Sequence, residues 1–361
     1  MANLSRITGV LQKVALRPGT TRQKPLNLAL QGGGAHGAFT WGVLDRLLED
    51  GRFRFDGVSG TSAGAVNAVG FAAGLAEGGP DGARAKLETL WRAVSEKGKL
   101  SPLKSSLSAL SQESPGGNWS TSRVMFDLMT RVLSPYQLNP LDVNPLRTVL
   151  EEAIDFKRLR RTSPVSLHIA ATDVANGSAR IFTEKEVSVD VVLASACLPQ
   201  IHQAVKIGRR HYWDGGYSAN PALLPLVRDC TAEDTLLVQI DPSTEKELPT
   251  RAPEIFDRLN RVTFNAPLQR EIEMIQMCRE MAAEGVTFGS RRRRRFQRHR
   301  FHRIEAARYT RDLAPGSKLS PDWELLCYLR DSGRTAARTW MKKCFPEVGA
   351  RSTIDLAAAF A

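Results

Sequence analysis

Two glycine-rich turns, each placed between an apolar strand and a helix, constrain the fold of this chain most. Residues 26–30 form a short apolar run that ends at Gly32-Gly33-Gly34-Ala35-His36-Gly37. Residues 55–59 form a second such run, and Gly60-Thr61-Ser62-Ala63-Gly64 follows it. Helical patterns come after both turns. Strand, helix, strand and helix at this density predict an α/β fold, with parallel strands joined by right-handed crossovers and helices on the faces of the sheet.

Further elements extend this pattern along the chain. The first helix is expected to end at Asp50-Gly51, and the second to run over residues 63–76 and to stop at Gly78-Gly79-Pro80. We also predict strands at 166–173, 179–182 and 236–240, helices at 189–196, 268–282 and 323–340, and a mobile surface loop or lid at 101–120.

Composition places the chain among ordinary globular proteins. Its 361 residues suffice for one large or two modest domains, and 42% are hydrophobic against 24% charged. No apolar stretch reaches the roughly 18 residues of a membrane-spanning helix. The basic N-terminus lacks the apolar core of a secretory signal. The five cysteines are odd in number and never form a C-x-x-C pair, which argues against a disulfide framework or a structural zinc site. We therefore expect a cytoplasmic protein.

Ser62 is a candidate nucleophile because residues 60–64 fit the pattern G-x-S-x-G. Small flanking residues let the backbone turn sharply, so that the hydroxyl stands clear at a helix N-terminus, where N–H groups and the helix dipole stabilise negative charge. The pattern by itself equally fits a serine that only caps a small-residue helix. Its position between a strand and a helix favours the nucleophile.

The glycine run at 32–37 is expected at the same edge of the sheet as Ser62, since the carboxyl ends of parallel strands meet there. Its backbone N–H groups would supply the oxyanion hole that a tetrahedral intermediate requires. The alternative is a phosphate-binding loop, which would need an acidic partner for a ribose and leaves Ser62 unexplained. His36 either adds a donor or faces solvent, and the sequence favours neither.

A serine nucleophile also needs a base. An α/β-hydrolase places its histidine last in the chain, but only His299 and His302 follow Asp214, and both lie in or beside a run of arginines. Asp214, in Trp213-Asp214-Gly215-Gly216, is the better candidate because a tight turn can project its carboxylate into a cleft. Asp-Gly is also an ordinary turn dipeptide, so this segment decides nothing in isolation.

Taken in this order, GGGAHG, GTSAG and DGG resemble the motifs of the patatin-like phospholipase family. ASACLPQ (194–200), HYWDGGYSANPAL (211–223) and SPYQLNP (134–140) are similar to bacterial members, and a weaker likeness extends to residues 317–334. The resemblance implies a three-layer fold with a mostly parallel central sheet. It divides the chain into a basic tail (1–25), a catalytic domain (26–228) and a largely helical C-terminal extension (229–361), with an arginine-rich loop at 290–300.

The resemblance also implies roles for single residues. Ser62 matches the nucleophile and Asp214 a general base that bonds the serine directly, without a triad. The oxyanion-hole glycines correspond to Gly32, Gly33 and Gly34, and the supporting motif positions to Gly37, Gly60, Gly64, Gly215 and Gly216. His36 stands where the family usually has lysine or arginine, and an ordinary histidine pKa near 6.5 leaves its charge open. The implied reaction is acyl transfer through an acyl-enzyme, with no metal or other cofactor.

The net charge of +12 is concentrated in two segments. Residues 286–311 carry ten arginines against Glu305, and residues 1–25 carry five basic residues and no acid. For the run at 291–300 we favour a solvated loop, and place contact with an anionic membrane second because the expected substrate lies in a lipid surface. Nucleic-acid binding comes last, because only Phe296 and Phe301 are available for base stacking.

The sequence thus predicts a lipid acyl hydrolase of the phospholipase A or esterase type, acting on a lipid or another ester. One alternative keeps the same dyad but cleaves another ester, such as intracellular polyhydroxyalkanoate. A second alternative is a regulatory protein with a vestigial site, which the presence of Ser62, Asp214 and all three glycines disfavours. Nothing in the sequence indicates an oligomeric state.

Overall fold

The computed structural model describes residues 23–99, 133–245, 248–284, 290–313 and 316–356. Its centre is an eight-stranded sheet with the order β5-β6-β3-β2-β1-β7-β8, and β4 pairs with β3 beside this path. The strands are β1 (Lys24–Leu30), β2 (Phe53–Gly60), β3 (Ser166–Asp173), β4 (Ala179–Thr183), β5 (Val205–Ile207), β6 (Arg210–Asp214), β7 (Asp234–Gln239) and β8 (Arg300–Glu305).

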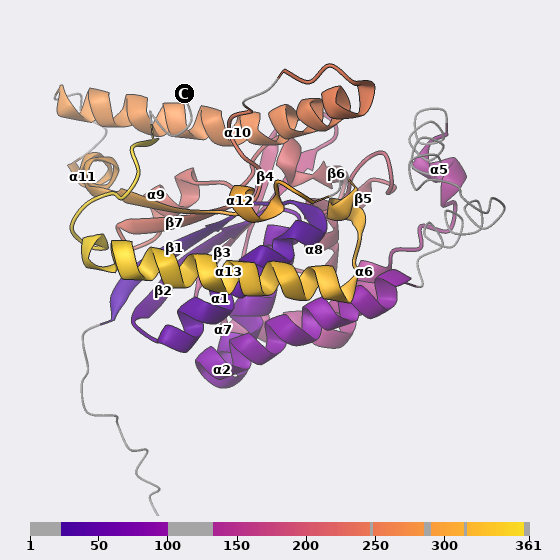
Figure 1. Cartoon of the computed structure of the whole chain (residues 1–361), viewed down its shortest axis with the longest axis horizontal. Coiled ribbons are helices and arrows are strands. Elements are labelled where there is room, and N and C mark those ends of the chain that lie inside the picture. The colour runs from indigo at the N-terminus through magenta and orange to yellow at the C-terminus, as the bar shows by residue number, and fades with distance from the viewer. Residues whose placement is uncertain (1–22, 100–132, 246–247, 285–289, 314–315, 357–361) are drawn as a thin grey trace, which may run out of the picture.

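Helices connect and cover these strands (Figure 1). They are α1 (Gly37–Asp50), α2 (Ala63–Lys99), α5 (Pro135–Leu138), α6 (Pro145–Ala153), α7 (Phe156–Thr162), α8 (Val189–Ser195), α9 (Leu224–Asp229), α10 (Ala252–Ala283), α11 (Ser290–Arg298), α12 (Ala307–Thr310) and α13 (Trp323–Cys344). Short 3-10 helices are η1 (Gly34–His36), η2 (Gly215–Tyr217), η3 (Ser317–Leu319) and η4 (Phe345–Glu347).

The sheet is mostly parallel, as the sequence predicts. β3, β2, β1, β7 and β8 run parallel to one another. The antiparallel pairs involve β4, β5 and β6 at one side of the sheet. The strands expected at 26–30, 55–59, 166–173, 179–182 and 236–240 are confirmed as β1, β2, β3, β4 and β7.

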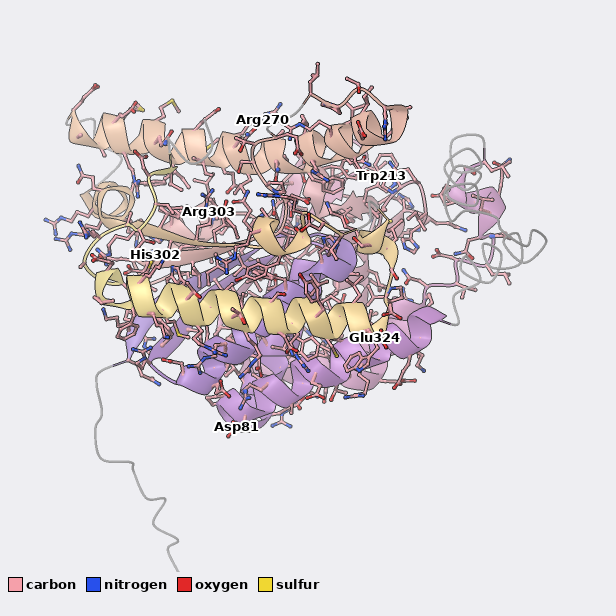
Figure 2. The ribbon with its side chains drawn as sticks, viewed as in Figure 1. Asp81, Trp213, Arg270, His302, Arg303 and Glu324 are labelled. Carbon is pink, nitrogen blue, oxygen red and sulfur yellow. The ribbon has the colours of Figure 1, made fainter. Side chains whose placement is uncertain are left out.

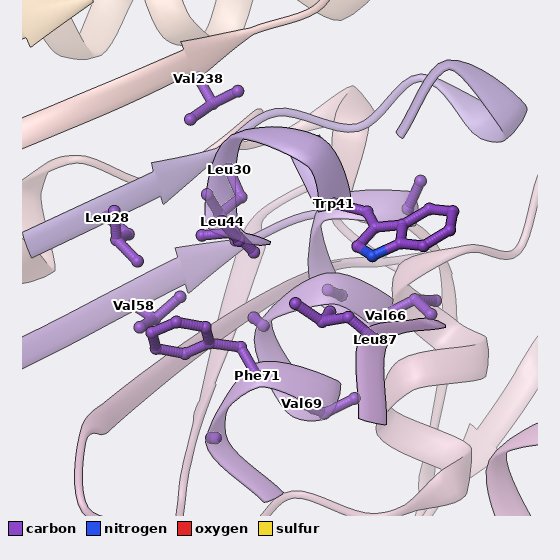
Figure 3. Packing of buried hydrophobic residues seen from close by; sticks show 14 of the residues in the cluster. Leu28, Leu30, Trp41, Leu44, Val58, Val66, Val69, Phe71, Leu87 and Val238 are labelled. Atoms are coloured by element: carbon purple, nitrogen blue, oxygen red, sulfur yellow. The ribbon is translucent and has the colours of Figure 1, made fainter. Parts of the chain in front are cut away.

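Alternation along β1 separates two cores, because successive side chains of a strand point to opposite faces of a sheet. Leu26, Leu28 and Leu30 pack into the larger core, while Ala29 belongs to the smaller core. Figure 1 shows α1, α2, α7 and α13 on one face of the sheet and α9, α10 and α11 on the other, which gives three layers. Figure 3 shows the larger core, where Leu28, Leu30 and Val58 of the strands meet Trp41 and Leu44 of α1 and Val66, Val69, Phe71 and Leu87 of α2.

Helix boundaries follow the local signals in the sequence. α1 ends at Gly51, whose φ of 72° is left-handed. α2 is interrupted at Gly78 and Gly79, where the second helix was expected to stop, but a further helical stretch continues it to Lys99. Ser188 caps α8 by accepting a hydrogen bond from Val191.

The prediction of an arginine-rich loop at 290–300 is wrong. Residues 290–298 form the helix α11, and β8 begins at Arg300. Tertiary contacts order this segment: Phe296 packs against the smaller core, and Arg295 Nη1 donates to the carbonyl oxygens of Arg228 and Cys230. The loop or lid expected at 101–120 lies outside the described residues. Within the described part of the chain, no helix is long and apolar enough to cross a membrane.

Candidate active site

Ser62 lies in the sharp turn between β2 and α2. Its φ of 55° is left-handed, which is strained for a residue with a side chain. The flanking glycines are required by close approach: a Cβ on Gly64 would lie 2.1 Å from the carbonyl oxygen of Leu30, and one on Gly60 would lie 2.4 Å from the carbonyl oxygen of Gly64. Ser62 N–H donates to Ser195 Oγ at 3.0 Å. This strand–turn–helix has the geometry of a nucleophile elbow.

Asp214 ends β6 and is fully buried. Its Oδ1 accepts a hydrogen bond of 2.7 Å from Gly216 N–H, while its buried Oδ2 has no hydrogen-bond partner in the described structure. Burial raises the pKa of Asp214 to about 7, and the Gly216 N–H and the Ser62 hydroxyl oppose this rise. The Ser62 hydroxyl is therefore a neighbour of the carboxyl, but it makes no hydrogen bond of normal geometry with Oδ2. Such bonds are often loose before substrate binds.

The glycine loop touches Ser62, because a Cβ on Gly32 would lie 2.9 Å from the Cβ of Ser62. The N–H of Gly32 donates to Asn220 Oδ1 at 2.8 Å, so it is not available to an oxyanion in this structure. By contrast, no described residue accepts a hydrogen bond from the N–H of Gly33, Gly34 or Ala63. Ala63 opens α2, where the first N–H groups of a helix have no partner within the helix. The free donors of the two glycine turns thus include the N–H groups of Gly33, Gly34 and Ala63; the sequence predicted N–H donors after Ser62 without naming Ala63.

Comparison with known proteins agrees with these motifs. The model of the patatin-like phospholipase family matches residues 28–227, which contain both glycine turns and the Asp214 turn. The chain belongs to this family.

Other comparisons add little to the family match. Among solved structures, the chain is similar to VipD from Legionella pneumophila, with a TM-score of 0.40 and 16% identity, over 89% of this chain and 67% of VipD. A search of the curated proteins found no match.

His36 of this patatin-like protein is buried, so the solvent-facing alternative is wrong. Its Nε2 lies 2.7 Å from Ser317 Oγ on η3. Burial, helped by the nearby Lys318, lowers the pKa of His36 to about 4, so the ring is neutral at pH 7. Lys318, whose Nζ pairs with Asp241, is a cation near His36. A Cβ on Gly34 would lie 2.3 Å from the carbonyl oxygen of Lys318, so η3 packs directly on the glycine loop.

Helix α10 forms a second support of the patatin-like site. Gln31, next to the glycine loop, donates from Nε2 to Asn265 Oδ1 at 2.8 Å. Asn220 Nδ2 donates to the carbonyl oxygen of Phe264 at 3.2 Å. The ring of Phe264 lies 4.9 Å from that of Tyr217 and closes the space beside Gly216. Asn220 therefore links the glycine loop to α10.

Some of these residues were not singled out from the sequence. Ser195 and Asn220 lie within the segments 194–200 and 211–223 that resemble the family, yet their partners are 133 and 188 residues away along the chain. A local sequence pattern cannot reveal a contact between residues that lie so far apart along the chain. The remaining motif glycines, Gly37 and Gly215, occupy close approaches: a Cβ on Gly37 would lie 2.6 Å from that of Ala63, and one on Gly215 would lie 2.2 Å from the carbonyl oxygen of Ala170.

The two late histidines do not join the site. His299 lies 2.7 Å from Thr235 Oγ1, and His302 bridges Asp234 and Thr353 at 3.0 Å each. β8 is separated from β2 by β1 and β7, which is about 14 Å at the usual strand spacing. Figure 2 shows His302 and Trp213, the neighbour of Asp214, on opposite sides of the molecule. In the described ranges, no group of three or more His, Cys, Asp or Glu side chains is placed to hold a metal.

Proposed function

We propose that this patatin-like protein is a lipid acyl hydrolase in which Ser62 is the nucleophile and Asp214 the general base. The observation that carries the proposal is the pairing of a strained serine with a fully buried carboxyl whose Oδ2 has no partner. The raised pKa of Asp214, about 7, suits a group that takes up and returns a proton near neutral pH.

The reaction would proceed in two halves. Ser62 Oγ attacks the ester carbonyl carbon while Oδ2 of Asp214 takes the hydroxyl proton, and the N–H groups of Gly33, Gly34 and Ala63 hold the oxyanion. The ester C–O bond then breaks, and the leaving alcohol takes the proton from Asp214. Water then attacks the acyl carbon while the same carboxylate takes its proton, the bond between the acyl carbon and Ser62 Oγ breaks, and the proton passes from Asp214 to Oγ as the fatty acid leaves.

Labelling by a fluorophosphonate probe tests the nucleophile, because an activated serine attacks phosphorus as it attacks a carbonyl. We expect the parent protein to be labelled and Ser62→Ala to remain unlabelled. Ser332→Ala, which changes a buried serine on α13, is the control and should label like the parent. Equal labelling of Ser62→Ala and the parent would contradict the assignment, and an unlabelled parent that hydrolyses no ester would favour a vestigial site.

Substrate class needs a separate experiment. We expect turnover of p-nitrophenyl esters of rising chain length and of phospholipid vesicles, both abolished by Ser62→Ala. If a polyhydroxyalkanoate suspension is hydrolysed while phospholipid vesicles are not, the alternative ester replaces the lipid.

A further inference from the structure

The outward side of α10 exposes an unusual amount of apolar surface. Twelve large hydrophobic side chains are exposed in the described parts of the chain, and six of them lie on this one helix. Their exposed fractions range from 41% to 55%, and they are Ile255, Phe256, Leu259, Val262, Met274 and Met277. Contiguous exposed apolar surface on a globular protein commonly marks a binding site.

Helical geometry places these residues on one side. At 100° per residue, Ile255, Leu259, Val262 and Met277 fall within an arc of about 60°, and Phe256 and Met274 lie about 60° beyond one edge of it. The opposite side is buried in the smaller core through Leu268, Ile272 and Ile275. Figure 1 shows α10 along the outer edge of the molecule, and Figure 2 shows side chains projecting from it away from the sheet. We call the four exposed residues that share this arc, Ile255, Leu259, Val262 and Met277, the α10 outer face.

We propose that the α10 outer face docks on an anionic lipid surface. An amphipathic helix binds such a surface by inserting its apolar side among the acyl chains while basic groups meet the head groups. Residues 251–300 carry twelve arginines against six acidic residues. Glu273 and Glu280 lie on the outward side of α10, so this helix itself contributes little net positive charge there. The excess of arginine comes mainly from α11, which packs beside α10.

The charges of α11 favour a membrane over a second copy of this chain. Arg294 and Arg298 are exposed, and neither has an acidic partner within the described ranges. Two copies meeting face to face would bring these positive charges together, which is unfavourable. Anionic head groups would instead neutralise them.

The α10 outer face lies close to the proposed active site, so docking there would serve catalysis at a lipid surface. The inward side of α10 contacts Gly216 through Phe264 and Gln31 through Asn265. The outer face is therefore about one helix diameter, roughly 10 Å, from the turn that holds Asp214. Docking would bring a lipid surface beside the site, and this use rests on the proposed function.

Vesicle cosedimentation tests the proposal without catalysis if every variant carries Ser62→Ala. We expect Ile255→Gln/Leu259→Gln to weaken binding to vesicles containing phosphatidylglycerol by about tenfold, since two apolar groups of the outer face are lost. Leu141→Gln/Tyr328→Gln, which changes two exposed residues outside α10, should bind like the parent. Glutamine is a good helix former, so α10 itself should persist.

Charge is tested by Arg294→Ser/Arg298→Ser. This variant should bind anionic vesicles more weakly, and at about 0.5 M salt, where screening is strong, it should bind like the parent. Vesicles of phosphatidylcholine alone should bind poorly. Equal binding of the parent to both vesicle types would overturn the anionic preference.

Other outcomes separate the surface from the proposed activity. With Ser62 restored, the α10 variant should hydrolyse a soluble short-chain ester like the parent but turn over vesicles more slowly. Lost vesicle binding together with an inert parent enzyme would keep the lipid surface and reject the proposed function. Unchanged vesicle binding by the α10 variant would overturn the proposal. So would a dimer of the parent in analytical sedimentation that Ile255→Gln/Leu259→Gln dissociates, because that result would assign the face to a second copy of the chain.

Discussion

At the scale of single residues, the buried carboxyl of Asp214 connects activity to pH. Burial raises its pKa to about 7, so the carboxyl is protonated and unable to accept a proton at lower pH. We expect kcat/KM for a soluble ester to fall about tenfold per pH unit below 7 and to level off above it. Asp214→Asn should lower turnover by roughly two orders of magnitude or more. A pH–rate profile measures both, and a profile flat from pH 5 to 8 would contradict the role of Asp214.

The same carboxyl should cost stability at neutral and higher pH. Between pH 4 and 7 the folded state binds a proton at Asp214 that the unfolded state, with a pKa of 3.8, has released. Stability therefore falls as pH rises through this window, by at most about 4 kcal/mol at 1.36 kcal/mol per pKa unit. Asp214→Asn should raise Tm relative to the parent more at pH 8 than at pH 5. Thermal unfolding at the two pH values decides this, and an equal difference at both would count against the raised pKa.

At the scale of elements, the turn between β2 and α2 brings the backbone of Gly64 so close to that of Leu30 that no side chain fits between them. Gly64→Ala would push a methyl group against the carbonyl oxygen of Leu30, so we expect a loss of about 2 kcal/mol or more in the free energy of unfolding. Gly78→Ala is the control for the space that a methyl group needs, because Gly78, at the interruption of α2, has a negative φ and has nothing within 4 Å of an added Cβ. Denaturant unfolding should separate the two variants, and similar losses in both would show that close approach does not govern Gly64.

Contacts between elements also explain why the arginine run is ordered. A segment of five successive arginines has no apolar periodicity of its own. Arg295 reaches two carbonyl oxygens near α9, and Phe296 enters the smaller core, while β8 pairs with β7 along its whole length. We infer that contacts of Arg295 and Phe296 with neighbouring elements hold this segment in place as a helix.

At the scale of the whole molecule, the sheet continues across the boundary expected at residue 228. β7 pairs with β1, and β8 pairs with β7, so residues beyond 228 contribute strands to the same sheet as the site. α13 packs along α1 and shares the larger core. The division into domains stays a prediction. We expect a fragment of residues 1–228 to unfold without cooperativity, because it lacks β7 and α13 and therefore exposes both cores. Circular dichroism during urea denaturation tests this against the full chain, and a fragment that unfolds cooperatively would establish an independent catalytic domain.

Much of the fold was predictable because the signals are local. Apolar runs of five to eight residues located β1, β2, β3 and β7, and the first two are followed directly by glycine turns. Ser62 and Asp214 also came from short motifs, but the Asp-Gly-Gly turn decides nothing by itself, and the role of Asp214 is implied by the resemblance of the three motifs to the patatin-like family.

The sequence by itself determined the α/β class and the two glycine turns, since backbone sterics and hydrophobic periodicity act between near neighbours, and it named the residues proposed for catalysis through the resemblance of its motifs to the family. Only the tertiary structure decided which N–H groups are free, because Asn220 takes that of Gly32 from 188 residues away. It also decided the neutral charge of His36, which depends on burial beneath Ser317, 281 residues later. Burial and hydrogen bonding at a site depend on segments that meet only when the chain folds. No short stretch of sequence therefore predicts them.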